Sequence, residues 1–324
     1  MKLMRYLKLT LVVLTVVSVT GFAVASDKIT ETYLKMGTSS SGGIFNALGV
    51  ATCQMWTERI PGVKFSAMVT GGSGTNSRMI GTKEIDVAFI AGETAFYAAK
   101  GEGQFKGKQV KNLMIIGNLF PAVLHFPVLK SSNIKTPYDF KDKKINVGTP
   151  GSGSETAAGI LAYFDLKADV NFSARHMKHA SAAEALTDEK IDGFIHLGGL
   201  GISHHMQAGA SGKAVFIPFA PESVREKFTK ENPIYYKFTM PANVYPNQNY
   251  PVETVATATF LAVRQDLSEE LVYQMTKQLF DNLPTLIQAH SAAKEITLEN
   301  ILKGAVLPVH PGALKYYKEV GILK

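Results

Sequence analysis

The chain has 324 residues, of which 46% are hydrophobic and 19% are charged, and its formal net charge is +7. This length is enough for two domains, and a modest positive charge without a clustered basic stripe does not indicate nucleic-acid binding. Cys53 is the one cysteine, which excludes an internal disulfide. It lies in a helix-like segment, where we expect it to be buried.

The first 25 residues have the pattern of a secretory signal peptide. A basic start is followed by an apolar run over residues 9–22 and by the small-residue cleavage pattern Ala23-Val24-Ala25. We expect cleavage near Ser26; an uncleaved N-terminal anchor is the alternative. Cleavage removes three basic residues and no acidic ones, which lowers the net charge from +7 to +4. Since no later stretch is long enough to span a bilayer, we expect a freely soluble, exported protein.

Strand-like and helix-like segments alternate along the rest of the chain, which indicates an α/β fold. Strands are predicted at residues 32–36, 63–69, 85–90, 113–119, 123–129, 144–147, 191–197, 215–218 and 255–263. Helices are predicted at residues 45–59, 76–81, 93–100, 137–140, 155–163, 182–187, 269–290 and 311–320. Residues 232–251 are rich in Pro, Asn and Tyr and have no period, so they are expected to form a loop or connecting ribbon.

Three Gly/Ser-rich turns each lie between a strand-like and a helix-like segment. They span Gly37–Gly43, Thr70–Gly74 and Gly148–Ser154. Such a turn leaves backbone N–H groups unpaired at the positive end of the helix dipole, and that arrangement suits an anion. The third turn lacks the lysine of a Walker loop. Together the turns predict a site for a small carboxylate.

A local pattern occurs twice in the chain. Residues 81–90 and 188–196 both read as a helix end, a polar turn and a short strand that runs toward a glycine-bearing loop. Two similar α/β lobes would give this repeat. The cleft between two lobes is the usual place for a small ligand.

Six segments, in a fixed order, resemble the TAXI family, the extracytoplasmic solute-binding proteins of TRAP transporters. Besides the three turns, they are Ile85–Phe89, Lys190–Phe194 and Leu307–Ala313. The resemblance covers essentially the whole mature chain. It implies an α/β, two-lobed periplasmic binding protein of type II. Each lobe would be a sheet flanked by helices, with the ligand cleft between the lobes and a two-strand hinge.

The expected organisation and partners follow from this resemblance. Residues 1–25 would be the signal peptide, residues 26–121 with 251–324 lobe I, and residues 122–250 lobe II. The receptor would capture a C4–C5 dicarboxylate, 2-oxoglutarate or a glutamate-like acid and deliver it to TRAP transporter membrane subunits, separate or fused. It would be a periplasmic monomer with no cofactor, no metal, no nucleic-acid partner and no catalytic residues.

The candidate ligand-binding residues lie in the three turns, on the helices that follow them and beside the predicted cleft. Lobe closure would bring the third turn onto a ligand already held by the first two. The candidates are Ser39, Ser40, Ser41, Gly43, Phe45, Gly71, Gly72, Ser73, Asn76, Arg78, Glu93, Phe120, Ser152, Gly153, Ser154 and His196.

These candidates also have ordinary structural explanations. Serines cap helices, glycines permit turns with positive φ, most arginines are solvated, and phenylalanines pack in cores. Glu93 could receive a ligand ammonium or occupy the first turn of a helix. His125 and His196 could bind the ligand and make binding pH-sensitive, or be structural. The pairs His176/His179 and His204/His205 lack cysteines or a tight carboxylate cluster, which disfavours a metal site.

The sequence departs from the family pattern beside the turns. Ile44, Phe45 and Asn46 stand where the family has Thr and two Tyr, and residues 91–93 stand where it has Gln, a small residue and Asp. These differences concern the ligand more than the fold. Two other function classes stay open: an exported enzyme, which requires a Ser–His pair at hydrogen-bond distance, and a sensor module that docks on a signalling receptor.

Overall fold

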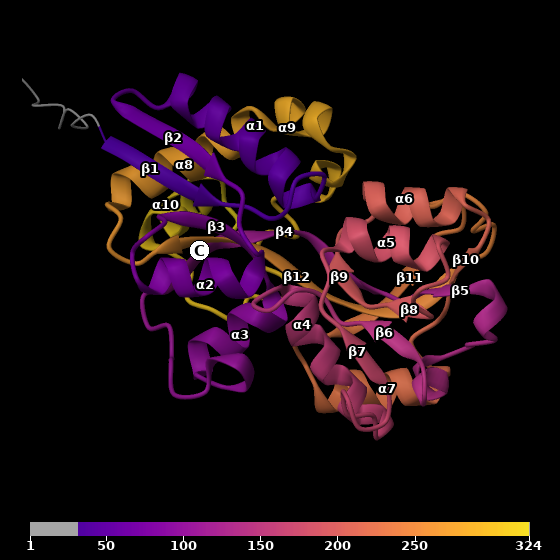
Figure 1. The fold of residues 1–324 in the computed structure, drawn as a ribbon. Helices are drawn as coiled ribbons and strands as arrows, with labels where there is room; N and C mark the ends of the chain where they lie inside the picture. Colours follow the sequence, from indigo (N-terminus) through magenta and orange to yellow (C-terminus); the bar gives the residue numbers. More distant parts are fainter. Residues whose placement is uncertain (1–31, 324) are drawn as a thin grey trace, which may run out of the picture.

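The computed structural model describes residues 32–323, so the expected signal peptide and cleavage point lie outside the described residues. The described residues form two sheets flanked by helices, in two bodies that lie side by side (Figure 1). No helix among them has both the length and the apolar character to cross a membrane.

The larger sheet has seven strands in the order β2-β1-β3-β12-β4-β9, with β11 also paired to β12. The first three strands along the chain are parallel to one another, and β12 runs antiparallel to both β3 and β4. The bounds are β1 (Thr32–Gly37), β2 (Val63–Met68), β3 (Val87–Ala91), β4 (Leu113–His125), β9 (His196–Gly198), β11 (Tyr236–Met240) and β12 (Val252–Arg264).

The smaller sheet has five short strands in the order β10-β5-β8-β6-β7. The pairs β6–β7 and β6–β8 are parallel, whereas β5 runs antiparallel to both of its neighbours. The bounds are β5 (Pro127–Leu129), β6 (Lys144–Asn146), β7 (Ser173–Arg175), β8 (Gly193–Phe194) and β10 (Ala214–Phe216).

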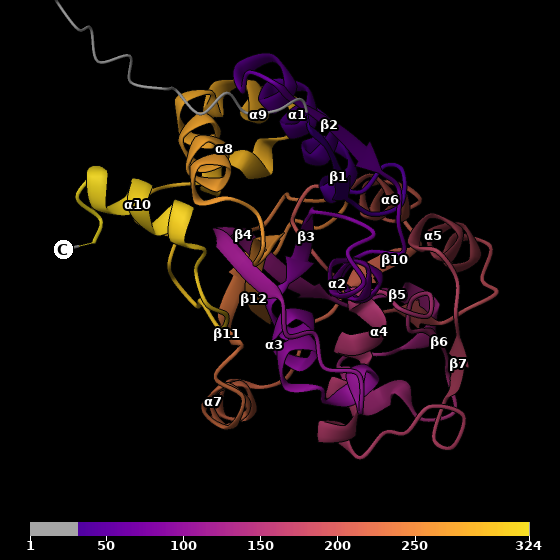
Figure 2. The same ribbon diagram turned by 90° about the vertical axis from the view of Figure 1, so that its left-hand side faces the viewer.

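Helices cover both sheets, and α2, α3 and α4 lie next to one another where the two bodies meet (Figure 2). The α-helices are α1 (Ile44–Arg59), α2 (Ser73–Gly81), α3 (Gly92–Lys100), α4 (Gly153–Ala158), α5 (His179–Thr187), α6 (Ser203–Ala210), α7 (Glu222–Glu231), α8 (Glu269–Asp281), α9 (Leu283–Ala289) and α10 (Pro311–Glu319). Short 3-10 helices span Gly103–Phe105, Lys130–Ser132, Pro137–Phe140, Gly159–Phe164 and Ser291–Glu295.

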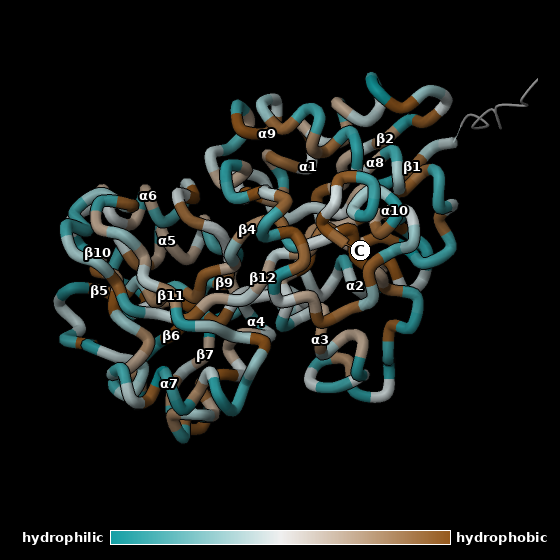
Figure 3. Tube along the Cα trace, turned by 180° about the vertical axis from the view of Figure 1, so that it is seen from behind, coloured by the Kyte–Doolittle hydropathy of each residue, from teal (hydrophilic) through white to brown (hydrophobic). Residues whose placement is uncertain are grey.

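The larger sheet is buried on both faces because its strands carry apolar side chains in both directions. On β3, Val87 and Phe89 pack with α1, α8 and α10, while Ala88 and Ile90 pack on the opposite face with α2 and α3. Figure 3 shows apolar segments along the strands and polar segments at the outer loops. Cys53 belongs to the first core, as the sequence predicted, and burial raises the pKa of its thiol to about 12.

The strands β4 and β12 are long and run between the two bodies (Figure 1). Their far ends pair with β9 and β11, which come from the segment expected to form lobe II. The seven-stranded sheet therefore contains strands from both expected lobes. The proposed lobe boundaries at residues 121–122 and 250–251 stay a prediction.

Several elements differ from the sequence prediction because of tertiary pairing. Residues 113–125 form one strand instead of two. Pro121 fits within this strand because β9 pairs with it only from Val123 onward. Within the described residues, one edge of the strand is therefore unpaired at Pro121, and the N–H group that proline lacks is not needed there. The predicted strand 191–197 is divided at Ile195: β8 pairs in the smaller sheet and β9 in the larger. The segment 232–251 includes β11, which pairs with β12.

The predicted helix 269–290 is two helices. Asn282 ends α8, and Pro284 lies in the first turn of α9, where its missing N–H and its ring prevent continuation of the preceding helix. The predicted helix 155–163 is likewise shorter: α4 passes into a 3-10 helix at Gly159. The elements α6, α7 and β7 were not predicted.

Candidate functional site

The three Gly/Ser turns meet at one cavity of about 120 Å³. Most of the candidate residues line it, and they come from both bodies of the molecule. The lining candidates are Ser39, Ser40, Gly43, Phe45, Gly71, Gly72, Ser73, Ser152, Gly153, Ser154 and His196.

The first two turns leave helix N-termini open toward the cavity. Gly43 and Gly72 are the N-cap residues of α1 and α2, and neither helix has a side-chain cap. Gly72 has φ of 92° and ψ of −156°, a conformation that only glycine adopts readily. The first N–H groups of α1 are therefore available to a ligand, together with the positive ends of both helix dipoles, whereas in α2 the Thr75 N–H already donates to Gly151 O at 2.9 Å.

The serines of these turns have different roles. Ser39 and Ser40 are half-buried at the cavity and do not cap α1, so capping does not account for them. Ser41 is exposed and lies outside the cavity. Ser73 is buried, and its hydroxyl accepts a hydrogen bond from the Ala91 backbone at 3.0 Å.

The third turn is held by its own hydrogen bonds. Ser152 caps α4, because its hydroxyl accepts from the Glu155 backbone N–H at 3.0 Å, and the Glu155 carboxylate accepts from Gly151 N–H at 2.7 Å. The Ser154 hydroxyl accepts from the Leu197 backbone at 3.1 Å and lies 3.1 Å from Nε2 of His179. The turn is thereby joined to β9 and α5.

Four other candidates lie away from the cavity. Asn76 is fully buried, and its amide donates to the carbonyls of Thr38 and Phe89 at 2.8 and 2.9 Å, which holds the first two turns together. Arg78 donates to Gln104 and lies over the ring of Phe105. These contacts give both residues a structural role.

Phe120 and Glu93 are also outside the cavity. Phe120 is buried, and its ring centroid is 6.4 Å from that of Phe45. Glu93 lines a second cavity of about 550 Å³, together with Tyr97, Glu155 and Tyr235. Among the described residues, its lining includes two acidic side chains and no lysine or arginine, so this larger cavity is poorly suited to an anion.

Sequence reasoning missed several residues of the cavity. Lys178 and His179 stand at the start of α5, and His204 is the second residue of α6. These three line the cavity together with Thr70, Thr149, Ile44, Leu197, Gly198, Gly199 and Ile202. No local signal connects α5 and α6 with the turns, since only packing between distant segments brings them there.

The electrostatic character of the cavity follows from its lining. Lys178 is a cation, two helix N-termini point in, and none of the described residues that line the cavity is acidic. Burial lowers the pKa of His179 to about 3 and that of His204 to about 4, so both rings are neutral at neutral pH. Nδ1 of His179 and Nε2 of His204 have no hydrogen-bond partner. The site can thus receive a negatively charged solute.

Comparison with known proteins places this chain in a family. A model of the NMT1-like family matches residues 36–321. The periplasmic nitrate-binding protein of Synechocystis PCC 6803 is 11% identical, with a TM-score of 0.50 over 84% of this chain and 69% of that chain. A structure described as a periplasmic transporter is 13% identical, with a TM-score of 0.50 over 90% of this chain and 93% of that chain.

A third structure is the alkanesulfonate-binding protein of Xanthomonas axonopodis pv. citri, 13% identical, with a TM-score of 0.49 over 83% of this chain and 85% of that chain. At such identities it is the fold that is shared. The first two likenesses and the two helix-flanked sheets confirm the predicted fold class, the two-lobed α/β fold of type II periplasmic binding proteins. With nearly the whole described chain matched, this protein belongs to the NMT1-like family.

Proposed function

We propose that this protein is a periplasmic receptor that captures a small organic anion between two lobes and delivers it to a membrane transporter. The observation that carries the proposal is the cavity where the Gly/Ser turns meet, with its open helix N-termini, hydroxyls and lysine and without a lining carboxylate. Membership of the NMT1-like family and the shared fold support it.

In this proposal residues 26–121 and 251–324 form lobe I, residues 122–250 form lobe II, and β4 and β12 are the hinge. Contacts between these segments support a closed arrangement. Thr75 N–H donates to Gly151 O at 2.9 Å, Ser203 donates to Gly42 O at 3.1 Å, and Gln104 is hydrogen-bonded to Thr156. Closure would exclude water from the cavity, which strengthens the attraction between the solute and its donors.

The solute we propose is a C4–C5 dicarboxylate, 2-oxoglutarate or a glutamate-like acid, and the partner is a TRAP-type membrane transporter. The six segments that resemble the TAXI family support both assignments. Ser39 and Gly72 on one side of the cavity, and Ser154 and Lys178 on the other, offer places for two carboxylates.

One observation favours a second function, an exported hydrolase. Ser154 and His179 are at hydrogen-bond distance, 3.1 Å, and both line the cavity. Against this, no group orients His179, because its Nδ1 has no partner, and a pKa near 3 makes the imidazole a weak general base at neutral pH. We therefore prefer the receptor.

A thermal-shift screen of the purified protein against small carboxylates tests the proposal. A solute that binds only the folded state raises the melting temperature by mass action. We expect a large rise with one C4–C5 acid that is recovered chemically unchanged. If the protein is folded and ligand-free and no acid raises its melting temperature, the dicarboxylate assignment fails.

An esterase assay of the same protein distinguishes the hydrolase from the receptor. Turnover of an activated ester that disappears in Ser154→Ala and in His179→Gln would favour the enzyme and overturn the receptor proposal. Turnover that is equal in the wild type and both variants would exclude Ser154 as a nucleophile.

A further inference from the structure

Five histidines lie close together beside the cavity, and the proposed anion site does not explain all of them. His125 ends β4, His196 is its direct cross-strand partner on β9, and His204 and His205 lie in the first turn of α6. His179 begins α5. Neighbouring ring centroids are 4.4–5.8 Å apart. The cavity proposal accounts for the three rings that line it and leaves His125 and His205 unexplained.

Three of these side chains converge in a buried position. His125, His196 and His205 each offer a ring nitrogen, and the three nitrogens lie within 4.8 Å of one another. All three residues are buried, with exposed fractions of 2%, 9% and 0%. We call these residues the histidine triad.

Hydrogen bonds determine which nitrogens of the triad carry lone pairs. Nδ1 of His125 lies 2.9 Å from the Val123 carbonyl, which can only accept, so this nitrogen carries the proton and Nε2 carries the lone pair. The Tyr245 hydroxyl lies 3.0 Å from that Nε2 and 3.3 Å from Nδ1 of His205. It can donate to the first and accept from the second, which leaves a lone pair on Nε2 of His205.

Two further ring nitrogens of the triad have no partner within the described residues. Nε2 of His205 and Nδ1 of His196 are buried without a hydrogen bond. Leaving such groups unpaired is costly, so each needs a compensating interaction.

We propose that the histidine triad binds a transition-metal dication of the Zn²⁺ class through Nε2 of His125, Nδ1 of His196 and Nε2 of His205. Neutral imidazoles suit Zn²⁺, Ni²⁺ and Cu²⁺ and are poor ligands for Mg²⁺ and Ca²⁺. The ion would displace the Tyr245 hydroxyl from Nε2 of His125. The Val123 carbonyl would still accept from Nδ1–H of His125, and the Tyr245 hydroxyl would still accept from Nδ1–H of His205. Such hydrogen bonds from the non-ligating nitrogen usually support a ligating histidine.

The triad leaves one coordination position of a tetrahedral ion for water or a solute. Because His196 also lines the cavity, that position lies next to the space where the anion is proposed to bind. The sequence disfavoured a metal because neither histidine pair along the chain is accompanied by cysteines or a tight carboxylate cluster. The triad instead draws on β4, β9 and α6, which only the fold brings together.

Zn²⁺ binding by untagged protein, stripped with a chelator, tests the proposal. We expect competition with a chromogenic zinc indicator to show one tightly bound equivalent, with no response to Mg²⁺ or Ca²⁺. His205→Gln and His125→Gln should each weaken binding by at least about tenfold. The exposed His176 lies outside the cluster, so His176→Gln is the matched control and should bind as the wild type does.

Two outcomes overturn the site: wild-type protein that binds no stoichiometric Zn²⁺, or triad variants that bind as tightly as His176→Gln. Should the triad variants not fold, zinc-edge X-ray absorption of the wild type decides. Three imidazole nitrogens at about 2.0–2.1 Å support the site, and fewer than three overturn it. The carboxylate screen is run on the same stripped protein with and without Zn²⁺, so that failure of the receptor and failure of the metal site appear separately.

Discussion

Glu93 shows how burial sets the behaviour of a single residue. It stands in the first turn of α3, where a carboxylate usually favours the helix dipole, yet it is only 3% exposed and its Oε2 atom has no hydrogen-bond partner. Burial raises the pKa of Glu93 to about 7, and the nearby Tyr235 hydroxyl acts in the opposite direction. Its charge therefore opposes folding at high pH.

Glu93→Gln should stabilise the protein at alkaline pH. The folded state holds this proton more tightly than the unfolded state, so the contribution of Glu93 to stability is lost as the pH rises from 4.5 to about 7. Since each pKa unit is worth about 1.4 kcal/mol, the variant should gain about 3 kcal/mol at about pH 8 and little at about pH 4. Urea unfolding at both pH values measures this, with the exposed Glu102→Gln as control. An equal gain in the free energy of unfolding at both pH values would contradict this assignment of the Glu93 pKa.

The three consecutive serines before α1 provide a matched test of the cavity. Ser39 faces the cavity, whereas Ser41 is exposed outside it. Ser39→Ala should weaken binding of the acid identified in the thermal-shift screen by about tenfold, because hydrogen bonds to charged groups contribute about 1.5–3 kcal/mol. Ser41→Ala should bind normally, and both should melt as the wild type does without ligand. Calorimetric titration measures the affinities; equal values for the two variants would remove the first turn from the site.

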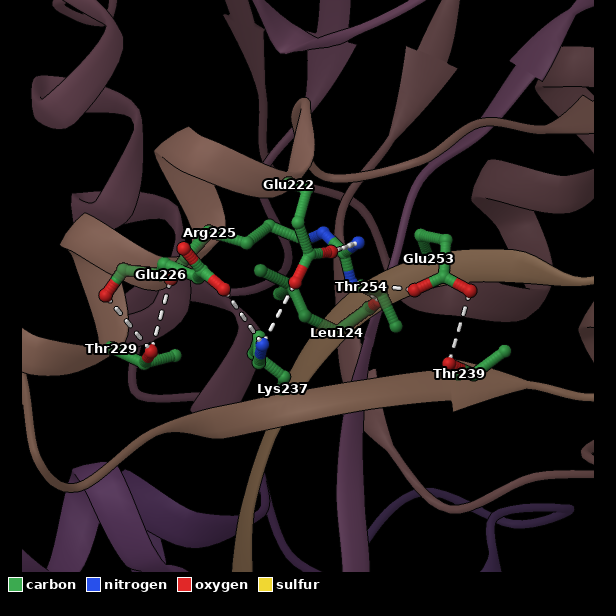
Figure 4. A network of polar contacts seen from close by, with 9 residues as sticks. All are labelled: Leu124, Glu222, Arg225, Glu226, Thr229, Lys237, Thr239, Glu253 and Thr254. Carbon is green, nitrogen blue, oxygen red and sulfur yellow. Dashed lines mark hydrogen bonds and ion pairs between the residues drawn. The ribbon is translucent and has the colours of Figure 1, made fainter.

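At the scale of elements, α7 is joined to the sheet through a buried arginine (Figure 4). Arg225 is 4% exposed and forms ion pairs with Glu222 on its own helix and with Glu253 on β12, the latter at 2.6 Å. Glu253 also accepts from Thr239 on β11 at 3.0 Å, and Lys237 on β11 reaches Glu222 at 2.8 Å. One helix and two strands thus share a charge network.

Arg225→Gln should destabilise the protein by about 2 kcal/mol. This is less than the 3–5 kcal/mol typical of a broken buried pair, because the carboxylates left behind are about half exposed and remain hydrated. Lys237→Gln, which removes an exposed charge from the same network, should cost less. Denaturant unfolding measures both. A Lys237 variant as destabilised as the Arg225 variant would show that burial of the guanidinium is not the decisive factor.

At the scale of the whole molecule, the proposed closure depends on close backbone approach between α2 and the third turn. Gly74 has no side chain, and a Cβ there would lie 2.5 Å from the Gly151 carbonyl of the opposite segment. The neighbouring Thr75 N–H donates to that same carbonyl at 2.9 Å. Any side chain at position 74 would therefore obstruct this approach.

Gly74→Ala should reduce solute affinity at least about tenfold, or about 1.4 kcal/mol, without lowering the melting temperature of the ligand-free protein. Alanine is a better helix former than glycine, so an open form should tolerate it. Gly159 has open space around its Cβ position, which makes Gly159→Ala the control. Small-angle scattering with and without solute should show that the Gly74 variant does not compact. Normal affinity and compaction would contradict the closure mechanism.

The sequence by itself determined the elements whose signals are local. The apolar runs of β1, α1, β3 and β12 and the glycines and serines of the three turns act over a few residues, so α/β alternation and most of the cavity lining could be predicted. Even the break between α8 and α9 has a local cause in Pro284.

Only the tertiary structure decided where chain-distant groups meet. Arg78 and Asn76 follow the second turn on the same helix, yet packing directs them to Gln104 and to two backbone carbonyls instead of the cavity. The change of sheet at Ile195 and the meeting of β4, β9 and α6 at the histidine triad depend on pairing between segments far apart in sequence. The physical reason is that side-chain period and turn chemistry are properties of neighbouring residues, whereas burial and convergence of side chains arise only when distant surfaces pack.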